Sequence, residues 1–402
     1  MDGFAKLPTF RSLSMSALVT ELPPAFAGAA GIGERQSDLA VFQQPWWLEI
    51  ARRGEDYHEL QVRHGGVVVG TLGFVLATNH IGNRLGFPPI WAHLGGPILE
   101  PGLGRSARAD VLHRLMAQLP RNISFKFVCN PIAPDADLTR QAFRGVGFEH
   151  HAETTYVQRC NDRDIMSRLS AKRRGQLRRA DRDLEVLEID AEKFIRFYRC
   201  NLREAGKTSY ASLANARDLI VKGQEGVPQV RVLAARQKGE DTPLDAAIAC
   251  AWDDTRYYLW LLTRRHNVDA NGRRPHGDAV KLLIFRATQH AQSLNLTFDV
   301  DGATTEGAKN LYDDILRFPL VESRDVFIRD TRIYRLYKQL KPRLREQSIK
   351  LRNSRGIKSW RSKAPGSPEQ AIQHFWTREE SSGDPAAVAG LRGTGTDHSA
   401  KP

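Results

Sequence analysis

Hydrophobic positions along this chain follow two periods, and each period predicts one type of element. Apolar and polar residues alternate over 59–63, residues 67–76 form a mostly apolar run, and His64-Gly65-Gly66 joins the two, which predicts a β-hairpin. After residue 279 the apolar residues recur at helical spacing, which predicts an amphipathic helix with one buried face. The residues of that face are Val280, Leu283, Ile284, Ala287, Ala291 and Leu294.

The remaining patterns divide the chain into two halves of similar plan. A linker helix at 169–180, with Ser170 as its N-cap, separates them. After the hairpin, the first half is expected to contain Pro- and Gly-rich loops at 82–104, helices at 107–119 and 138–144, and strands at 124–129 and 153–158. The second half is expected to contain helices at 191–205, 212–222 and 306–316, and strands at 230–236, 244–252, 257–262, 296–300 and 326–329.

This doubled order of elements predicts an α/β (α+β) fold with two tandem domains. Each domain is expected to hold a mixed, mostly antiparallel sheet flanked by helices, and a duplication explains the repetition. The domains are expected at 39–165 and 166–340. Residues 1–38 are predicted to form a disordered leader, and 341–402 a basic, largely disordered tail, because both ends are poor in periodic apolar residues.

Composition limits the classes of protein to consider. The chain has 402 residues, of which 41% are hydrophobic, enough for real cores. It contains no apolar run of about 18 residues, so no transmembrane segment is expected. The start of the chain does not resemble a signal peptide. Its four cysteines form no CxxC pair, which predicts neither a zinc site nor a disulfide framework, and therefore no metal and a cytoplasmic location.

The formal net charge is +13, which favours a polyanionic partner such as tRNA or an anionic membrane surface. The alternative is that the excess charge lies in flexible ends. The sharpest basic cluster is in the linker helix, where Arg174 and Arg178 fall on one face and are candidates for binding substrate phosphates. A solvated helix face with Asp181, Asp183 and Glu185 nearby is the other interpretation. A second basic stretch, 332–352, suggests an attachment to the inner face of a membrane.

Residues 271–294 form an Arg/Gly loop that opens into a helix, and the strand expected at 257–262 lies just before them. The first backbone N–H groups of a helix have no internal partners and carry partial positive charge, so they bind anions. A diphosphate is expected to lie on these amides beside Arg273 and Arg274, with Gly277 and Ala279 in the loop. An ordinary surface loop is the alternative.

Five motifs carry a resemblance to a known family. Arg274-Pro-His-Gly277-Asp-Ala279 resembles the R/Q-x-x-G-x-G/A pyrophosphate loop of the GNAT acyltransferase superfamily, and Ala308-Lys-Asn-Leu-Tyr312 resembles its A-x-x-L-Y segment. The order of 42–47 (FQQPWW), 169–174 (LSAKRR) and 298–302 (FDVDG) is similar to that of tandem GNAT proteins of the FemAB and CelD type. The resemblance implies two GNAT-like domains, the first of them degenerate because it lacks the loop.

The resemblance also implies a donor, a reaction and site residues. The donor is acyl-CoA or acetyl-CoA, and the acceptor is an unidentified amine or hydroxyl, often in polysaccharide or cell-envelope synthesis. Tyr312 would protonate the leaving thiolate, and the strand that includes Leu261 and Leu262 would offer an N–H to the thioester oxygen. The base is left open among Asp299, Asp301, Glu306 and His276.

Structural roles compete with these assignments. Tyr312 is equally expected to pack under the sheet, Asp299 and Asp301 either line a cleft or cap a helix, and Trp260 belongs either to a core or to a substrate site. Three functions follow: an acyl-CoA-dependent N- or O-acyltransferase, a FemAB-type transferase that uses aminoacyl-tRNA, or a non-catalytic GNAT scaffold. The absence of a long helical insert argues against the second.

Overall fold

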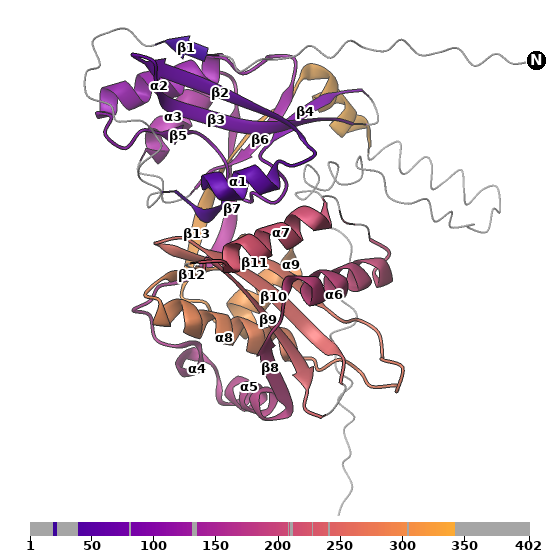
Figure 1. Cartoon of the computed structure of the whole chain (residues 1–402). Helices are drawn as coiled ribbons and strands as arrows, with labels where there is room; N and C mark the ends of the chain where they lie inside the picture. Colours follow the sequence, from indigo (N-terminus) through magenta and orange to yellow (C-terminus); the bar gives the residue numbers. More distant parts are fainter. Residues whose placement is uncertain are drawn as a thin grey trace, which may run out of the picture.

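A computed structural model describes residues 19–21, 39–79, 82–130, 135–207, 209, 212–226, 228–239, 242–303 and 305–341. In this part of the chain, strands form one sheet with helices on both faces (Figure 1). The sheet is mostly antiparallel, as predicted, and the parallel pairs are β1–β2, β4–β6 and β11–β12.

The first half of the chain builds one lobe around the predicted hairpin. Its helices α2 and α3 pack against the sheet over a core that includes Val111, Phe125 and Phe143. Its elements are β1 (Val19–Glu21), η2 (Val41–Gln43), α1 (Pro45–Ala51), β2 (Asp56–His64), β3 (Val67–Thr78), β4 (Arg84–Phe87), β5 (Ile98–Leu99), α2 (Arg105–Ala117), β6 (Ser124–Val128), α3 (Ala136–Gly145) and β7 (Glu149–Gln158).

The second half builds the other lobe, with helices on both faces of β9, β10 and β11. This explains why β10 is buried along nearly its whole length instead of alternating. Its elements are α4 (Ile165–Arg168), α5 (Ala171–Asp183), β8 (Leu184–Glu188), α6 (Ala191–Glu204), α7 (Leu213–Gln224), β9 (Val230–Gln237), β10 (Leu244–Trp252), β11 (Arg256–Arg264), α8 (Ala279–Ser293), β12 (Thr297–Asp299), α9 (Glu306–Asn310), the π-helical turn η3 (Leu311–Ile315) and β13 (Leu320–Arg329). Residues 332–341 are also helical.

The strand order connects the two lobes. It runs β1-β2-β3-β4-β6-β13-β7-β12-β11-β10-β9-β8, with β5 paired to β3. The last strand, β13, therefore lies between β6 and β7 of the first half and pairs with both. In Figure 1, β7 and β13 run between the lobes. The two halves thus share one continuous sheet.

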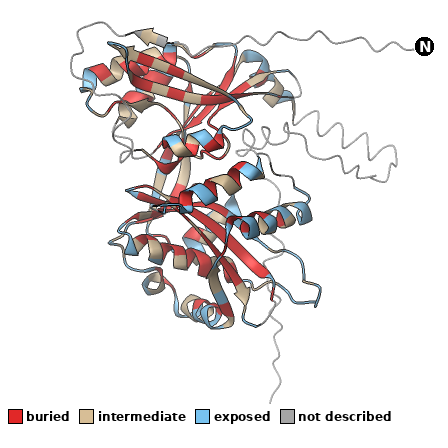
Figure 2. Ribbon diagram, viewed as in Figure 1, coloured by how far each residue is buried: buried red, intermediate tan, exposed pale blue. Residues whose placement is uncertain are grey.

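The pattern of buried residues follows the arrangement of the sheet and its helices. Strand residues of the central sheet are buried, while the outward faces of α2, α5, α6 and α7 are exposed (Figure 2). The core between α1, α6, α7 and the sheet includes residues from both halves, among them Phe42, Trp47 and Leu219. The junction is therefore a hydrophobic core and not a loose contact.

Most predicted elements are confirmed, and the differences have local causes. The predicted face of α8 is correct except at its end: the helix stops at Ser293, so Leu294 is 41% exposed. Strands β4 and β5 lie where Pro- and Gly-rich loops were expected, and β8 follows α5 directly. Strand β1 lies inside the predicted leader and pairs with β2. The remainder of the predicted leader and residues 342–402 of the predicted tail lie outside the described residues.

Candidate active site between β11 and β12

Strands β11 and β12 separate after a short parallel pairing. The pairing joins Arg256–Tyr258 to Thr297–Asp299, but β11 continues to Arg264. The register between β10 and β11 also shifts at Ala249/Cys250, so that Trp260 is an extra, bulged residue. Beyond Tyr258, no strand of the described chain pairs with this side of β11. Backbone groups on this side of β11 near Leu261 and Leu262 therefore have no strand partner in the described chain.

The segment after β12 turns away from β11 and toward β7. Val300 donates its backbone N–H to Tyr156, and Ala303 donates to Thr154. Between them, Asp301 and Gly302 both have positive φ angles, 59° and 92°. An aspartate tolerates this conformation better than most residues do. The turn places the Asp301 carboxylate against His93 and Arg324 instead of continuing the strand.

Two aspartates of this segment, Asp299 and Asp301, are bound by buried arginines. Arg324 donates to Asp299 at 2.9 Å and to Asp301 at 2.6 Å, and Arg256 donates to Asp299 at 2.7 Å. Thr155 also donates to Asp299, at 2.5 Å. Asp299 is 0% exposed. Its oxygens are therefore occupied, and its role in the structure is to anchor the ion-pair network.

The ion pairs of this network keep Asp301 and Arg324 in their charged forms. Burial alone acts to raise the pKa of Asp301, but His93 and Arg324 outweigh it and hold this pKa below its ordinary value. For Arg324 burial opposes the charge, yet Asp299 and Asp301 together keep its pKa above the usual range. Asp301 is consequently an ionised acceptor of hydrogen bonds at neutral pH.

His93 joins this network from the first half of the chain. Its Nδ1 is hydrogen-bonded to Asp301 Oδ2, and its ring stacks on Phe42 with centroids 5.4 Å apart. The His93 side chain is 24% exposed, whereas that of Asp301 is 1% exposed. Sequence analysis missed this residue, because a single histidine in a Pro- and Gly-rich loop carries no periodic or motif signal, and its partner lies 208 residues away.

Tyr312 lies in the π-helical turn η3, close to the turn formed by Asp301 and Gly302. Its ring packs against Tyr156 at 5.9 Å and Phe318 at 5.7 Å, and it is 6% exposed. Burial, and then the charge of Asp301, raise the pKa of the Tyr312 phenol. The phenol therefore keeps its proton at neutral pH. Of the two roles expected from the sequence, ring packing describes this position, and the role as proton donor to a thiolate stays a prediction.

The loop before α8 uses several of its amides internally. Asp269 accepts from the N–H groups of Asn271 at 2.9 Å and Arg273 at 2.7 Å. Asp245 accepts from the N–H of His276 at 3.1 Å and from the Arg265 side chain. This part of the loop is shaped by carboxylates, and those amides are not available to an anion.

Other donors of the loop remain. The side chains of Arg273 and Arg274 are exposed, Gly277 is exposed, and Ala279 is buried in the first turn of α8. Within the described chain, the N–H groups of Gly277, Val280 and Lys281 have no acceptor. An anion at this position would meet these three amides and Arg274.

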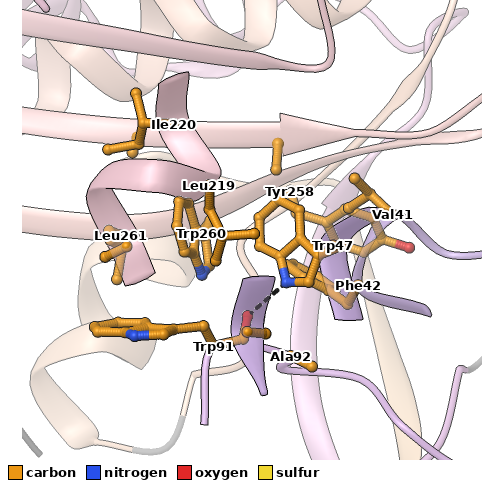
Figure 3. Packing of buried hydrophobic residues seen from close by; sticks show 14 of the residues in the cluster. Val41, Phe42, Trp47, Trp91, Ala92, Leu219, Ile220, Tyr258, Trp260 and Leu261 are labelled. Atoms are coloured by element: carbon orange, nitrogen blue, oxygen red, sulfur yellow. Dashed lines mark hydrogen bonds between the residues drawn. The ribbon is translucent and has the colours of Figure 1, made fainter. Parts of the chain in front are cut away.

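Trp260 lies in an aromatic cluster that joins the two halves. It is 3% exposed and packs against Trp47 at 4.8 Å and Trp91 at 6.0 Å (Figure 3). Trp47 donates its indole N–H to the carbonyl of Trp91, as the dashed line in Figure 3 marks. The indole N–H of Trp260 and the hydroxyl of Tyr258 are buried without a partner in the described chain. Both belong to β11 at the point where it separates from β12.

The basic helix α5 begins as predicted, since the Ser170 side chain accepts from the N–H of Arg173. Arg174 is half-buried and donates to the carbonyl of Leu169, whereas Arg178 is exposed, as are Lys172 and Arg179. The structure thus gives Arg174 a local partner and leaves Arg178 on the surface.

The sequence predicts neither a metal site nor a transmembrane segment. Among the described residues, no group of three His, Cys, Asp or Glu side chains could hold a metal ion. No helix in the same part of the chain is both long and apolar enough to cross a membrane.

Comparisons with known proteins bear on the fold. No protein-family model matches the sequence, and no curated protein matches it. The structure is similar to that of FemX, with 10% identity and a TM-score of 0.51 over 75% of this chain and 94% of FemX. It also matches L-PGS from Bacillus licheniformis (10% identity, TM-score 0.46, 75% of this chain and 96% of that one). A third match is a tandem GNAT protein from the clavulanic acid biosynthesis pathway (12% identity, TM-score 0.39, 69% of this chain and 83% of that one). The predicted α/β fold class, with a mixed, mostly antiparallel sheet flanked by helices, is confirmed, and the similarity to FemX is one of fold alone.

Proposed function

We propose that this protein is an acyltransferase that moves an acyl group from acyl-CoA to an amine or hydroxyl. The observation that carries the proposal is the separation of β11 from β12 after Tyr258, next to the N-terminus of α8. A thioester in this opening can place its carbonyl oxygen against a backbone N–H near Leu261 or Leu262, which stabilises the developing oxyanion. The diphosphate of the donor would lie on the free amides at Gly277, Val280 and Lys281.

The acidic and phenolic groups have separate parts in this proposal. Tyr312 supplies the proton for the departing thiolate, because its raised pKa keeps it protonated. Asp299, fully buried and bound by Arg256 and Arg324, holds the network and does not touch substrate. Trp260 shapes the wall of the opening. The acceptor class favoured is a sugar or cell-envelope precursor handled in the cytoplasm.

Binding of acetyl-CoA tests the donor directly. We expect acetyl-CoA to raise the melting temperature of the wild-type protein, and Arg274→Glu to remove this rise by repelling the diphosphate. Arg196→Glu is the matched control, since Arg196 is an exposed residue of α6, a helix that packs on the opposite face of the sheet. No rise with acetyl-CoA or a long-chain acyl-CoA at millimolar concentration would remove acyl-CoA as the donor.

A second candidate is transfer from aminoacyl-tRNA. It is favoured by the exposed Lys172, Arg178 and Arg179 of α5 and by the loop amides already taken by Asp269 and Asp245. Its signature is tRNA binding whose affinity falls steeply with salt and weakens in an Arg178→Glu/Arg179→Glu double variant. If neither acyl-CoA nor tRNA binds, the non-catalytic scaffold is the function that remains.

A further inference from the structure

We infer that His93 is the general base of the transfer, that Asp301 holds it in the required tautomer, and that the acceptor enters from the first half of the chain. The inference rests on the proposed function and deepens it, because it names the group that removes the acceptor's proton. It joins residues from both halves into one catalytic unit. It also gives the first half, which lacks a pyrophosphate loop, a part in the reaction.

The hydrogen bond to Asp301 fixes which nitrogen of His93 carries the proton. An ionised carboxylate only accepts hydrogen bonds, so His93 Nδ1 must donate to Asp301 Oδ2. In a neutral imidazole the other nitrogen, Nε2, then has a free lone pair. Within the described chain no donor lies on Nε2, and the side chain is 24% exposed. His93 can therefore accept a proton from a bound acceptor.

The carboxylates are poorer candidates for the same task. Asp299 is fully buried, and its oxygens are bound by Arg256, Arg324 and Thr155. Asp301 is occupied by Arg324 and His93, which also stabilise its ionised form. A base must reach the substrate and gain a proton readily. Asp299 fails the first condition because it is fully buried, and Asp301 fails the second because its ionised form is stabilised. Their position fits residues that orient and balance the charge of a protonated His93.

The proposed acid and base both lie near the carboxylate of Asp301. Tyr312 is close enough to Asp301 for the charge of the carboxylate to act on its phenol, while His93 contacts the carboxylate directly. Tyr312 comes from the second half, next to the proposed donor site, and His93 from a first-half loop. We therefore expect the thioester to approach from the side of α8 and the acceptor from the side of His93.

The step balances with these residues alone. The nitrogen or oxygen of the acceptor attacks the thioester carbon, a C–N or C–O bond forms, and the C–S bond breaks. The acceptor's proton passes to His93 Nε2, and the phenol of Tyr312 gives its proton to the leaving thiolate. His93 then releases its proton to solvent as Tyr312 regains one, so that the enzyme is unchanged.

The test compares His93→Asn with His113→Asn, a control on the exposed side of α2. Asparagine keeps a donor for Asp301 but has no Nε2. With acetyl-CoA as the donor, thiol release is measured with an ordinary alkylamine, which is protonated at neutral pH, and with hydroxylamine, which is mostly unprotonated there and depends far less on a base. We expect His93→Asn to bind acetyl-CoA normally, to lose about 100-fold to 10,000-fold with the alkylamine, and to keep most of the hydroxylamine rate.

Each outcome has a separate meaning. An alkylamine rate for His93→Asn within threefold of the control overturns the inference and leaves the proposed function intact. Equal losses with both amines also overturn it, because they indicate a general structural role. No acetyl-CoA binding by the wild-type protein removes the proposed function and this inference together. If His93→Asn does not fold, His93→Gly with and without added imidazole replaces it, and rescue of the alkylamine rate by imidazole is required.

Discussion

Arg324 donates one hydrogen bond to Asp299 and another to Asp301, at 2.9 Å and 2.6 Å, and so joins two carboxylates that would otherwise repel each other. Arg324 belongs to β13, which lies between β6 and β7 of the first half. The ion pair therefore couples the geometry of the candidate site to the pairing of strands that connect the lobes. A buried charge that loses its partner is costly, which makes this contact a sensitive point of the fold.

Removal of the Arg324 charge should destabilise the protein strongly. Arg324→Met removes the cation that the two buried carboxylates share and leaves Asp299 with Arg256 and Asp301 with His93. We expect a loss of about 3–5 kcal/mol in the free energy of unfolding. Chemical denaturation measures this loss. The matched control is Arg335→Met, since Arg335 is exposed and lies 3.5 Å from an exposed Glu149. The control should cost less than about 1 kcal/mol, and equal effects of the two variants would contradict the role given to the network.

A side chain at Gly302 should disturb the turn that presents Asp301. Gly302 has a φ of 92°, and an added Cβ would lie 2.6 Å from an oxygen of Glu153. We expect Gly302→Ala to lower stability by about 1–3 kcal/mol. Gly272→Ala is the control, because Gly272 also has a positive φ, 75°, but has open space around it. A stability loss for Gly302→Ala no larger than for the control would mean that the turn tolerates the contact.

The stability of the protein should depend on pH through Glu55. Burial raises the pKa of Glu55 to about 7, against a smaller opposing effect of a hydrogen bond from Ile90. Its folded-state pKa lies above its ordinary value of 4.5, so the folded protein binds more protons than the unfolded chain between these values. The contribution of Glu55 to stability is therefore complete below about pH 4.5 and is lost as the pH rises through about 7.

Glu55→Gln removes this titration. We expect the difference in melting temperature between pH 5 and pH 8 to shrink in this variant compared with the wild-type protein. Glu225→Gln, on an exposed carboxylate at the end of α7, is the control and should leave the difference unchanged. Identical pH profiles for Glu55→Gln and the wild type would show that Glu55 is not the group responsible.

Local features of this protein could be predicted from the sequence, and non-local pairings could not. The hairpin turn at His64-Gly65-Gly66, the N-cap at Ser170 and the buried face of α8 each depend on neighbouring residues, and the structure confirms them. The insertion of β13 between β6 and β7 depends on pairings such as Val326 with Val128, far apart in sequence. Periodicity identifies a strand but does not identify its partner.

The residues of the candidate site also divide into those predicted from local motifs and those brought in by contacts distant in sequence. Tyr312, Asp301 and the Arg274 loop were predicted from motifs that lie close together in the second half. His93 belongs to a different half and reaches Asp301 only because the sheet is continuous. The arginines that bind the aspartates, Arg256 and Arg324, were also missed. They lie at strand positions where a charged residue is expected to face solvent, and their burial becomes evident only from the ion pairs they make.

Tyr312→Phe separates catalysis from packing. The phenylalanine keeps the ring that packs against Tyr156 and Phe318 and removes only the hydroxyl, so folding and acetyl-CoA binding should be unchanged. If the phenol protonates the departing thiolate, thiol release from acetyl-CoA should fall by about 100-fold or more. An acyl donor with a better leaving group, such as an aryl thioester, needs little protonation and should lose far less. Tyr156→Phe is the control, since it removes a neighbouring hydroxyl from the same aromatic group. Equal rates for the Tyr312 variant and this control would assign Tyr312 to packing alone and leave the departing thiolate without an acid from this chain.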